Sequence, residues 1–178
     1  MLVQFYRGNN TQFQNFKNFK FREFECKCGK CKTQKIDTAV VNLAQMVRNH
    51  FNKSVIVNSA YRCDEHNKNI GGAKNSNHTK GTALDIVVKG IDPLTVARYC
   101  EYIGAGGVGL YSWGVHIDTR AKKYFWIDGK GQVISFLEQP NTVEFLQIRL
   151  NHEFNEKLRV DGNFGKDTKT AVLKHFAK

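Results

Sequence analysis

The sequence predicts a compact α+β domain with a largely antiparallel sheet, followed by a small helical module. Strand-like and helix-like segments mix without the regular strand–helix–strand order that builds a parallel sheet. Residues 128–131, Asp-Gly-Lys-Gly, separate two apolar segments and form a good hairpin signal. Near residue 138 the strand pattern ends and only helical periodicity follows. We therefore expect two domains, at 1–138 and 139–178.

The first 35 residues are polar and aromatic, and their spacing fits no single helix or strand. We expect an irregular arm, part of the first domain, whose Phe side chains are buried against the rest of that domain because they are large and apolar. These residues are Phe5, Phe13, Phe16, Phe19, Phe21 and Phe24.

The next hundred or so residues carry the main helix and strand patterns. Asp37 is a suitable N-cap, and apolar residues recur at helical spacing from there to Phe51. A second helix is expected from Asp92-Pro93 to about Ile103, since Pro suits a first helical turn. β-branched and apolar runs predict strands over 54–60, 82–88, 106–111, 115–119, 124–127 and 132–136, with a short helix or loop over 62–72. Beyond residue 139, helices are expected around 143–150 and over 168–176.

The composition describes a basic, globular chain. Hydrophobic residues make up 41% of the sequence, and 27 Lys and Arg against 16 Asp and Glu give a formal charge of +11. Such a surface attracts polyanions, among them nucleic acid, anionic lipid and anionic wall polymers, although an evenly basic soluble surface is equally consistent. No stretch approaches the roughly 18 apolar residues of a membrane helix, so we expect no stable membrane insertion. The first ten residues lack the apolar core of a secretory signal.

Five cysteines form an uneven set that does not suggest a full disulfide framework. Together with the missing signal they favour synthesis in a reducing cytosol. The segment 26–31, Cys-Lys-Cys-Gly-Lys-Cys, looks like half of a zinc knuckle, and Cys63 is a possible fourth ligand. The sequence leaves open a structural metal, a cysteine pair, or free thiols beside the Phe-rich arm.

Two histidines and an aspartate form the strongest chemical pattern. His78 lies in a Gly-containing loop, Asp85 in the strand that follows, and His116 in a later strand. Two His and one Asp make a reasonable ligand set for catalytic Zn²⁺ with a fourth position left to water. Alternation places Asp85 and His116 away from their apolar strand neighbours, so the two could meet across one sheet face. Each could instead be a structural residue, although burying a carboxylate is costly unless it is paired or bound to metal.

These residues carry a family resemblance. The pattern Ser76-x-His78-x-x-Gly81-x-Ala83-x-Asp85 resembles the signature of the zinc D-alanyl-D-alanine carboxypeptidases and the related L-alanyl-D-glutamate endopeptidases. The stretches 59–76 and 106–120 resemble the blocks before and after it, so the match covers roughly residues 20–136. The resemblance implies that His78, Asp85 and His116 bind Zn²⁺, and it implies the fold shared with hedgehog-type domains.

The resemblance also implies a role for Arg62, which would stabilise a tetrahedral oxyanion or hold a substrate carboxylate. The alternative is a surface arginine that pairs with Asp64 or Glu65.

The sequence leaves open which residue would act as the general base. Some relatives carry an acidic residue three places before the last zinc histidine, or a His two places before it; here Trp113 and Gly114 stand at those places. Asp118 is the best local substitute, because alternation puts it on the same strand face as His116. Its alternative role is to orient a metal ligand from behind.

The segment beyond residue 145 resembles the small helical peptidoglycan-binding domain common in wall hydrolases. The matching blocks are 145–147, 158–165 and 168–172. The alternative is a helical appendage that only seals the first domain.

The function expected from these patterns is that of an endolysin-like zinc metallopeptidase, which hydrolyses peptide bonds in the stem or cross-link of bacterial peptidoglycan as a carboxypeptidase or an endopeptidase. We expect a monomer that is made in the cytoplasm, acts at the cell wall after release, and contacts peptidoglycan and anionic wall polymers. The Trp113-Gly114 stretch keeps open a non-catalytic, zinc-containing wall-binding protein. A nucleic-acid partner is not expected, because it would leave the metal pattern unexplained.

Overall fold

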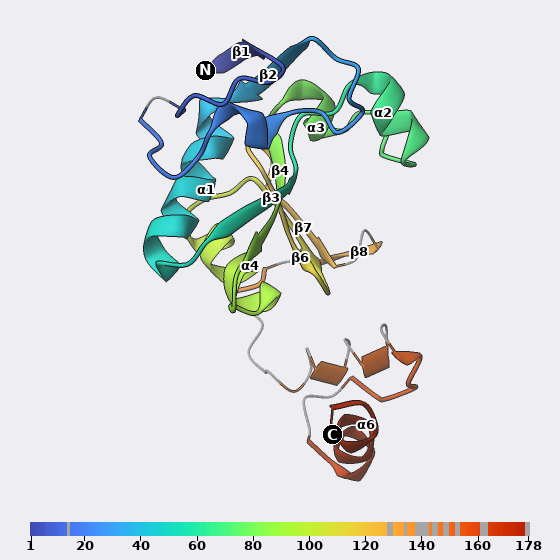
Figure 1. Ribbon diagram of the computed structural model, residues 1–178. Helices are drawn as coiled ribbons and strands as arrows, with labels where there is room; N and C mark the ends of the chain where they lie inside the picture. The colour runs from blue at the N-terminus through green and yellow to red at the C-terminus, as the bar shows by residue number, and fades with distance from the viewer. Residues whose placement is uncertain are drawn as a thin grey trace. The chain divides into compact units, whose positions relative to one another are not determined.

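The computed structural model describes residues 1–13, 15–127, 130–133, 135–137, 143, 146–147, 150–151, 154–160 and 164–176. The chain forms two compact units, Met1–Phe136 and Leu137–Lys178. The first unit mixes helices with a mostly antiparallel sheet, so the predicted α+β fold class is confirmed (Figure 1). Within the described residues, no helix is both long and apolar enough to cross a bilayer.

A six-stranded sheet forms the centre of the first unit. In spatial order its strands are β3 (Val55–Ser59), β4 (Ala83–Val88), β6 (Gly114–Asp118), β5 (Gly107–Tyr111), β7 (Tyr124–Ile127) and β8 (Lys130–Val133). Neighbouring strands are antiparallel except for β5 and β7, which are parallel. The predicted turn at 128–131 falls partly outside the described residues.

Two helices cover one face of this sheet. Helix α1 (Thr38–Phe51) begins at Asp37, whose side chain accepts a hydrogen bond from the Ala39 N–H at 2.8 Å. Helix α4 (Pro93–Tyr102) is capped in the same way by Asp92. Both caps are as predicted, because Asp accepts from the otherwise unpaired N–H groups of a first turn. Figure 1 shows the two helices together on one side of the strands.

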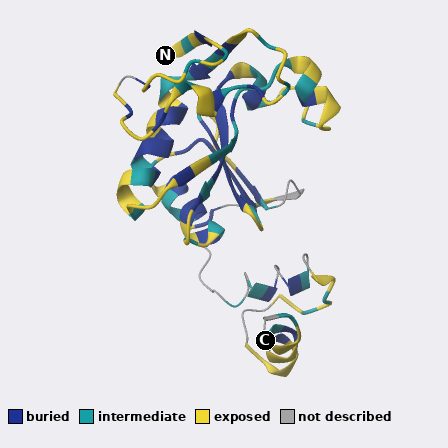
Figure 2. Ribbon diagram, viewed as in Figure 1, coloured by how far each residue is buried: buried dark blue, intermediate teal, exposed yellow. Residues whose placement is uncertain are grey.

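Alternate residues of the central strands form the core under these helices. Leu84 lies opposite Ile117, which lies opposite Val108 on the next strand, and all three are fully buried. Figure 2 shows that burial is concentrated in the strands and on the inner side of α1. Because strand side chains alternate between faces, the residues between these apolar ones point to the opposite face, where polar groups gather.

The N-terminal segment is more regular than predicted. Strands β1 (Leu2–Tyr6) and β2 (Thr33–Asp37) form a two-stranded antiparallel sheet, and a short 3₁₀ helix, η1 (Phe21–Phe24), lies between them. The two strands pair across about 30 residues of chain, so no local pattern in the sequence announces them. The Phe side chains form an aromatic cluster, in which the Phe13 and Phe21 rings stack with centroids 4.3 Å apart and the other ring pairs are tilted or edge-to-face. The buried members are Phe5, Phe13, Phe16, Phe19 and Phe24.

Two short helices connect β3 to β4. Helix α2 (Asp64–Asn69) falls within the segment predicted as a short helix or loop, whereas α3 (Asn77–Lys80) replaces the loop that the sequence predicted around His78. The Ser76 hydroxyl caps α3 by accepting from the His78 N–H at 3.3 Å. Gly81 ends α3 with φ of 76°, and a Cβ at this position would lie 2.8 Å from the Lys35 carbonyl oxygen. The turn therefore needs glycine.

In the second unit, helix α6 (Lys166–Phe176) begins two residues before the predicted start at Thr168. Inside this unit the Gln147 amide donates to the Thr168 hydroxyl at 2.9 Å, and both side chains are buried. The helix predicted around 143–150 lies partly outside the described residues.

Candidate active site

The site is built on one row of residues across the sheet. Asp85 on β4 lies directly opposite His116 on β6, and His116 lies opposite Gly109 on β5. Gly109 in turn lies opposite Trp126 on β7. The row is on the face opposite α1 and α4, so its side chains point away from the apolar core. The strand register alone brings Asp85 and His116 together.

His78 joins this pair from helix α3. Its Nε2 lies 3.2 Å from the Asp85 Oδ1 and 3.2 Å from the His116 Nδ1, while the latter two atoms are 2.8 Å apart. All three residues are buried. The structure therefore gathers His78, Asp85 and His116, the three residues that the sequence selected as metal ligands, around a single point.

Hydrogen bonds on the far side of each imidazole determine which nitrogen faces that point. The His78 Nδ1 lies 2.7 Å from the Ala60 carbonyl oxygen, which can only accept, so this nitrogen donates and Nε2 keeps its lone pair. Burial lowers the pKa of His78, which favours this neutral form. The His116 Nε2 likewise faces the Asp118 Oδ2 at 3.1 Å, which turns Nδ1 toward Asp85.

Three potential metal-ligand atoms thus converge, the His78 Nε2, the His116 Nδ1 and the Asp85 Oδ1, and the neighbouring carboxylates favour a positive charge among them. Burial disfavours the charged form of His116, but the hydrogen bonds with Asp118 and Asp85 outweigh it and raise the pKa of His116. Burial likewise opposes ionisation of Asp85, but the bonds with His116 and His78 hold the pKa of Asp85 well below its usual range. In tetrahedral Zn²⁺ sites, N and O ligands about 2.0–2.1 Å from the metal lie roughly 3.3 Å from one another. The separations of 2.8–3.2 Å are close to this value and slightly shorter.

Asp118 lies behind His116. It is fully buried, and its Oδ2 also accepts from the Asn77 amide at 2.9 Å and from the Arg120 Nη2 at 2.5 Å. Burial opposes ionisation, but the bonds with His116 and Arg120 keep the pKa of Asp118 far below its usual range. The carboxylate contacts the outer nitrogen of the His116 imidazole, which is the contact that an orienting residue would make.

Arg62 contacts Asp85 from the loop between β3 and α2. Its Nη2 donates to the Asp85 Oδ2 at 2.5 Å, and its Nε donates to the Ser59 hydroxyl at 2.8 Å. Glu65, one of the surface partners that the sequence left open for Arg62, pairs with Lys30 at 3.5 Å. Arg62 therefore lies inside the site, where it fixes the second carboxylate oxygen of Asp85.

An open cleft of about 680 Å³ leads to the three candidate ligands. One wall is aromatic: the Tyr111 and Trp113 rings stack at 5.3 Å, and the Trp126 indole N–H donates to the Tyr111 hydroxyl at 3.1 Å. Trp113 is 47% exposed at this wall. The Gly71-Gly72 turn and the start of α3 also line the cleft. Among the described residues that line the cleft, Asp85 is the one acidic side chain.

The comparison with protein families agrees with this geometry. A family model described as Peptidase M15 matches residues 17–119, more than half of the chain. The chain belongs to the peptidase M15 family. M15 peptidases are metallopeptidases, and the cluster of His78, Asp85 and His116 supplies possible metal-binding groups. The family resemblance found in the sequence is confirmed, while residues beyond Thr119 lie outside the M15 match.

Curated relatives cover a shorter part of this M15 chain. Over 80 residues it is 38% identical to the peptidoglycan L,D-endopeptidase MepK of Escherichia coli (strain K12). The MepK of Shigella flexneri matches with the same identity. The alignments cover 41% of this chain and 44% of each relative. The chain thus spans less than half the length of the curated relatives it matches.

Several residues of the site were not found from the sequence. Asn77 and Arg120 hold Asp118, and Trp126 lies with its ring centroid 5.0 Å from that of His116. A weak indication that Arg120 contacts Asp118 was present in the sequence, since Arg120 follows Asp118 by two positions at the end of a strand. For Trp126 there was none, because its place depends on the pairing of β7 with β5.

Proposed function

We propose that this chain is a zinc-dependent peptidase that cuts peptide bonds in bacterial peptidoglycan, with His78, Asp85 and His116 as the zinc ligands. The observation that carries the proposal is the convergence of three potential ligand atoms, from buried residues, in an open cleft. When bound there, zinc would act as a Lewis acid on the scissile carbonyl and lower the pKa of a water molecule. Two imidazoles and one carboxylate leave a fourth position for that chemistry.

In this proposal Arg62 binds the substrate oxygen that becomes negative in the reaction. The guanidinium has five N–H donors, and the contacts to Asp85 and Ser59 leave others for a substrate. Its position in the cleft wall, fixed by these two contacts, means that it need not reorganise when charge develops on the substrate.

Asp118 acts as a positioning residue for His116 in the proposed mechanism. Its carboxylate fixes the ring orientation and tautomer of the imidazole and raises the basicity of the nitrogen that faces the metal. The hydrogen bonds from Arg120 and Asn77 keep that carboxylate ionised and hold it in a fixed position.

The Asp118→Asn variant tests this role. We expect zinc affinity and kcat/KM to fall together, each by about 10–100-fold, as is typical when the outer partner of a metal-bound histidine is changed. Asp64→Asn, which changes an exposed acid at the start of α2, is the matched control. Zinc titration and turnover on the same preparations separate the possibilities. Unchanged zinc affinity with a collapse of kcat would instead identify Asp118 as a general base.

The shape of the cleft favours an endopeptidase over a carboxypeptidase. In this proposal the stacked pair of Tyr111 and exposed Trp113 forms one wall of the open cleft, along which a peptide stem would lie. A carboxypeptidase would need a closed end that recognises a terminal carboxylate. The name of the relative MepK, an L,D-endopeptidase, supports the same choice.

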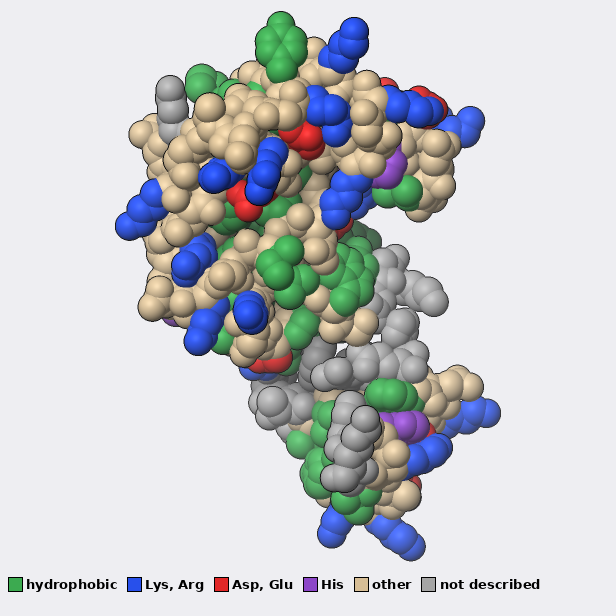
Figure 3. Space-filling view, viewed as in Figure 1, with side chains coloured by type: hydrophobic (Ala, Val, Ile, Leu, Met, Phe, Trp, Pro, Cys, Tyr) green, Lys and Arg blue, Asp and Glu red, His purple; other side chains and the backbone are tan. Residues whose placement is uncertain are grey.

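Wall binding and the cellular role form a further part of the proposal. Residues 137–178 would anchor the enzyme on peptidoglycan, as the sequence resemblance of this segment suggests. Figure 3 shows Lys and Arg side chains spread over the visible face of Met1–Phe136, a distribution suited to diffuse attraction to anionic wall polymers. An endolysin that is made in the cytoplasm and released to the wall would use both properties.

The test is digestion of purified peptidoglycan with and without a chelator, followed by mass spectrometry of the released fragments. We expect chelator-sensitive cleavage of the peptide stem or cross-link, with new termini that identify the bond. Zinc-loaded protein that binds the wall but releases no fragment from several stem chemistries would reject the enzymatic proposal. That result would favour a non-catalytic wall-binding protein.

A further inference from the structure

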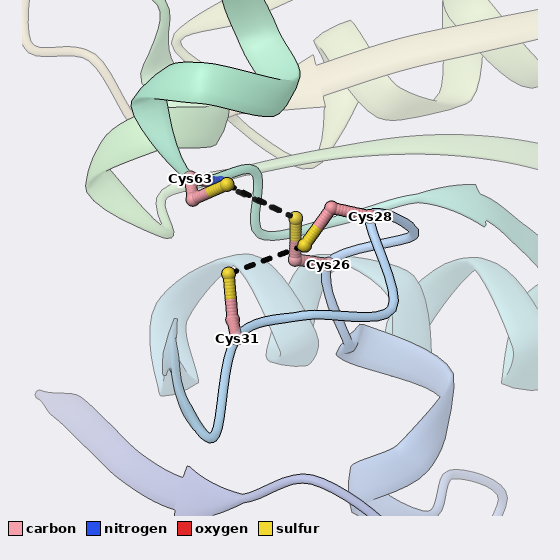
Figure 4. Close-up of side chains that lie close together, drawn as sticks. All are labelled: Cys26, Cys28, Cys31 and Cys63. Atoms are coloured by element: carbon pink, nitrogen blue, oxygen red, sulfur yellow. Dashed lines mark hydrogen bonds between the residues drawn. The ribbon is translucent and has the colours of Figure 1, made fainter.

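Four cysteines gather at a second place in the first unit. Cys26, Cys28 and Cys31 lie in the loop between η1 and β2, and Cys63 is the N-cap residue of α2. Figure 4 shows their side chains turned toward one another, three from the loop and one from the helix start. The four sulfur atoms all lie within 4.8 Å of one another. Residues distant in the sequence thus bring four potential thiolates to a common centre.

The spacing of these sulfurs fits a tetrahedral metal site. With Zn–S bonds of 2.3 Å, tetrahedral sulfur ligands lie about 3.8 Å apart. The Sγ atoms of Cys26 and Cys63 are 3.8 Å apart, and those of Cys28 and Cys31 are 3.3 Å apart. Both distances are far longer than the roughly 2.05 Å of a disulfide bond. We propose that Cys26, Cys28, Cys31 and Cys63 bind a structural zinc ion that is separate from the peptidase cleft.

Backbone groups around the sulfurs are arranged to stabilise thiolates. The N–H of Lys30 points to the Cys28 sulfur at 3.3 Å, that of Cys63 to the Cys26 sulfur at 3.3 Å, and that of His66 to the Cys63 sulfur at 3.4 Å. Such outer hydrogen bonds orient metal ligands and offset their negative charge. A loop that packed its cysteines only as small apolar side chains would not need three N–H groups directed at sulfur.

Positive side chains complete the surroundings. Arg7 donates to the Cys26 carbonyl at 2.6 Å and to the Cys31 carbonyl at 2.8 Å, so it holds both ends of the cysteine loop. Lys27, Lys30 and Lys32 occupy positions of the same segment. Four thiolates around Zn²⁺ leave two net negative charges, which these cations offset in part, since Arg7 also pairs with Glu25 and Lys30 with Glu65. The set has four ligands and no open position, as in structural and not catalytic zinc sites.

The location of the site indicates what it stabilises. Cys63 directly follows Arg62, and α2 leads from Cys63 to the Gly71-Gly72 turn at the cleft. The cysteine loop follows the Phe-rich segment, whose fold relies on packing over a short length of chain. A metal ion bound to both would join this N-terminal segment to the wall of the cleft and restrict the backbone next to Arg62.

Metal content and X-ray absorption of the whole 178-residue chain, purified without chelator, test the proposal. We expect the wild type to hold about two zinc ions per chain and His78→Ala/His116→Ala to hold about one. The ion that remains in the double histidine variant should have four sulfur neighbours at about 2.3 Å. This variant leaves the cysteines intact, so the measurement does not depend on a cysteine variant folding.

The complementary variants complete the design. Cys28→Ser/Cys31→Ser should lose the sulfur-bound zinc and melt at a lower temperature, while Cys100→Ala, which changes a buried thiol outside the cluster, should keep it. A metal-free double histidine variant, an ion with only nitrogen and oxygen neighbours, iron in place of zinc, or a native disulfide among the four cysteines would each overturn the proposal. Because the two sites have different ligand atoms, sulfur-bound zinc without zinc in the cleft would count against the proposed function alone.

Discussion

His78→Ala should lose the zinc ion of the cleft and the peptidase activity together. The substitution removes one of the three converging ligand atoms, so only Asp85 and His116 remain to bind the metal. Loss of Lewis-acid catalysis worth about 4 kcal/mol corresponds to a fall in kcat/KM of about a thousandfold. His116→Ala should give the same result, since its Nδ1 is the third ligand atom. Zinc analysis and fragment release from the wall measure the two losses on one preparation.

A matched histidine variant separates this effect from general damage. His50→Ala changes an exposed histidine on α1, which stacks on Tyr99 and does not line the cleft, so it should keep both zinc and activity. Circular dichroism melting of each variant would show whether the fold is retained. A metal-free His78→Ala protein with full activity would exclude the site assignment.

Arg62→Gln is expected to retain zinc and to lose turnover. The glutamine keeps polar groups near Asp85 but removes the positive charge and the forked donors that would meet a developing oxyanion. Removal of one such donor typically lowers kcat by about 10²–10³-fold. The fall should appear in kcat more than in KM, because the interaction forms chiefly in the transition state.

Arg22→Gln serves as the control, because it changes an exposed arginine of η1 outside the cleft. If Arg62 instead holds a carboxylate of the substrate in its ground state, KM would rise while kcat stayed near the wild-type value. Loss of zinc from Arg62→Gln would mean that the contact to Asp85 is needed to keep the metal site itself.

Asp85 and His116 could be predicted from the sequence as candidate metal ligands because these polar, ionisable side chains stand between apolar neighbours in predicted strands. Asp85 stands between Leu84 and Ile86 in an apolar strand, and such a carboxylate requires a partner. Strand alternation then predicted that its side chain and that of His116 point to a polar face, and the observed register places them opposite each other. These arguments use only local pattern and the cost of burying charge.

Other parts depend on contacts between distant segments and escaped prediction. The pairing of β1 with β2 joins the ends of the Phe-rich segment, and neither strand has a pronounced alternation of its own. Helix α3 is one turn long, and its formation depends on the Ser76 cap and the Gly81 turn rather than on apolar periodicity. The cysteine cluster is different, because the sequence already suggested Cys63 as a possible fourth ligand, and the folded chain brings it to the other three cysteines.

The glycines of β5 have a consequence for how the sheet assembles. Gly109 lies between His116 and Trp126, and a Cβ there would collide with the Trp126 indole; a Cβ at Gly107 would collide with the Asp118 carboxylate. A shift of β7 by one residue along β5 would place the bulky Val108 or Leu110 beside Trp126 and send the indole to the other face. Because the space beside Gly107 and Gly109 admits no Cβ, these two glycines favour a single register between β5 and its neighbours. Correct strand pairing therefore also places the side chains of the site.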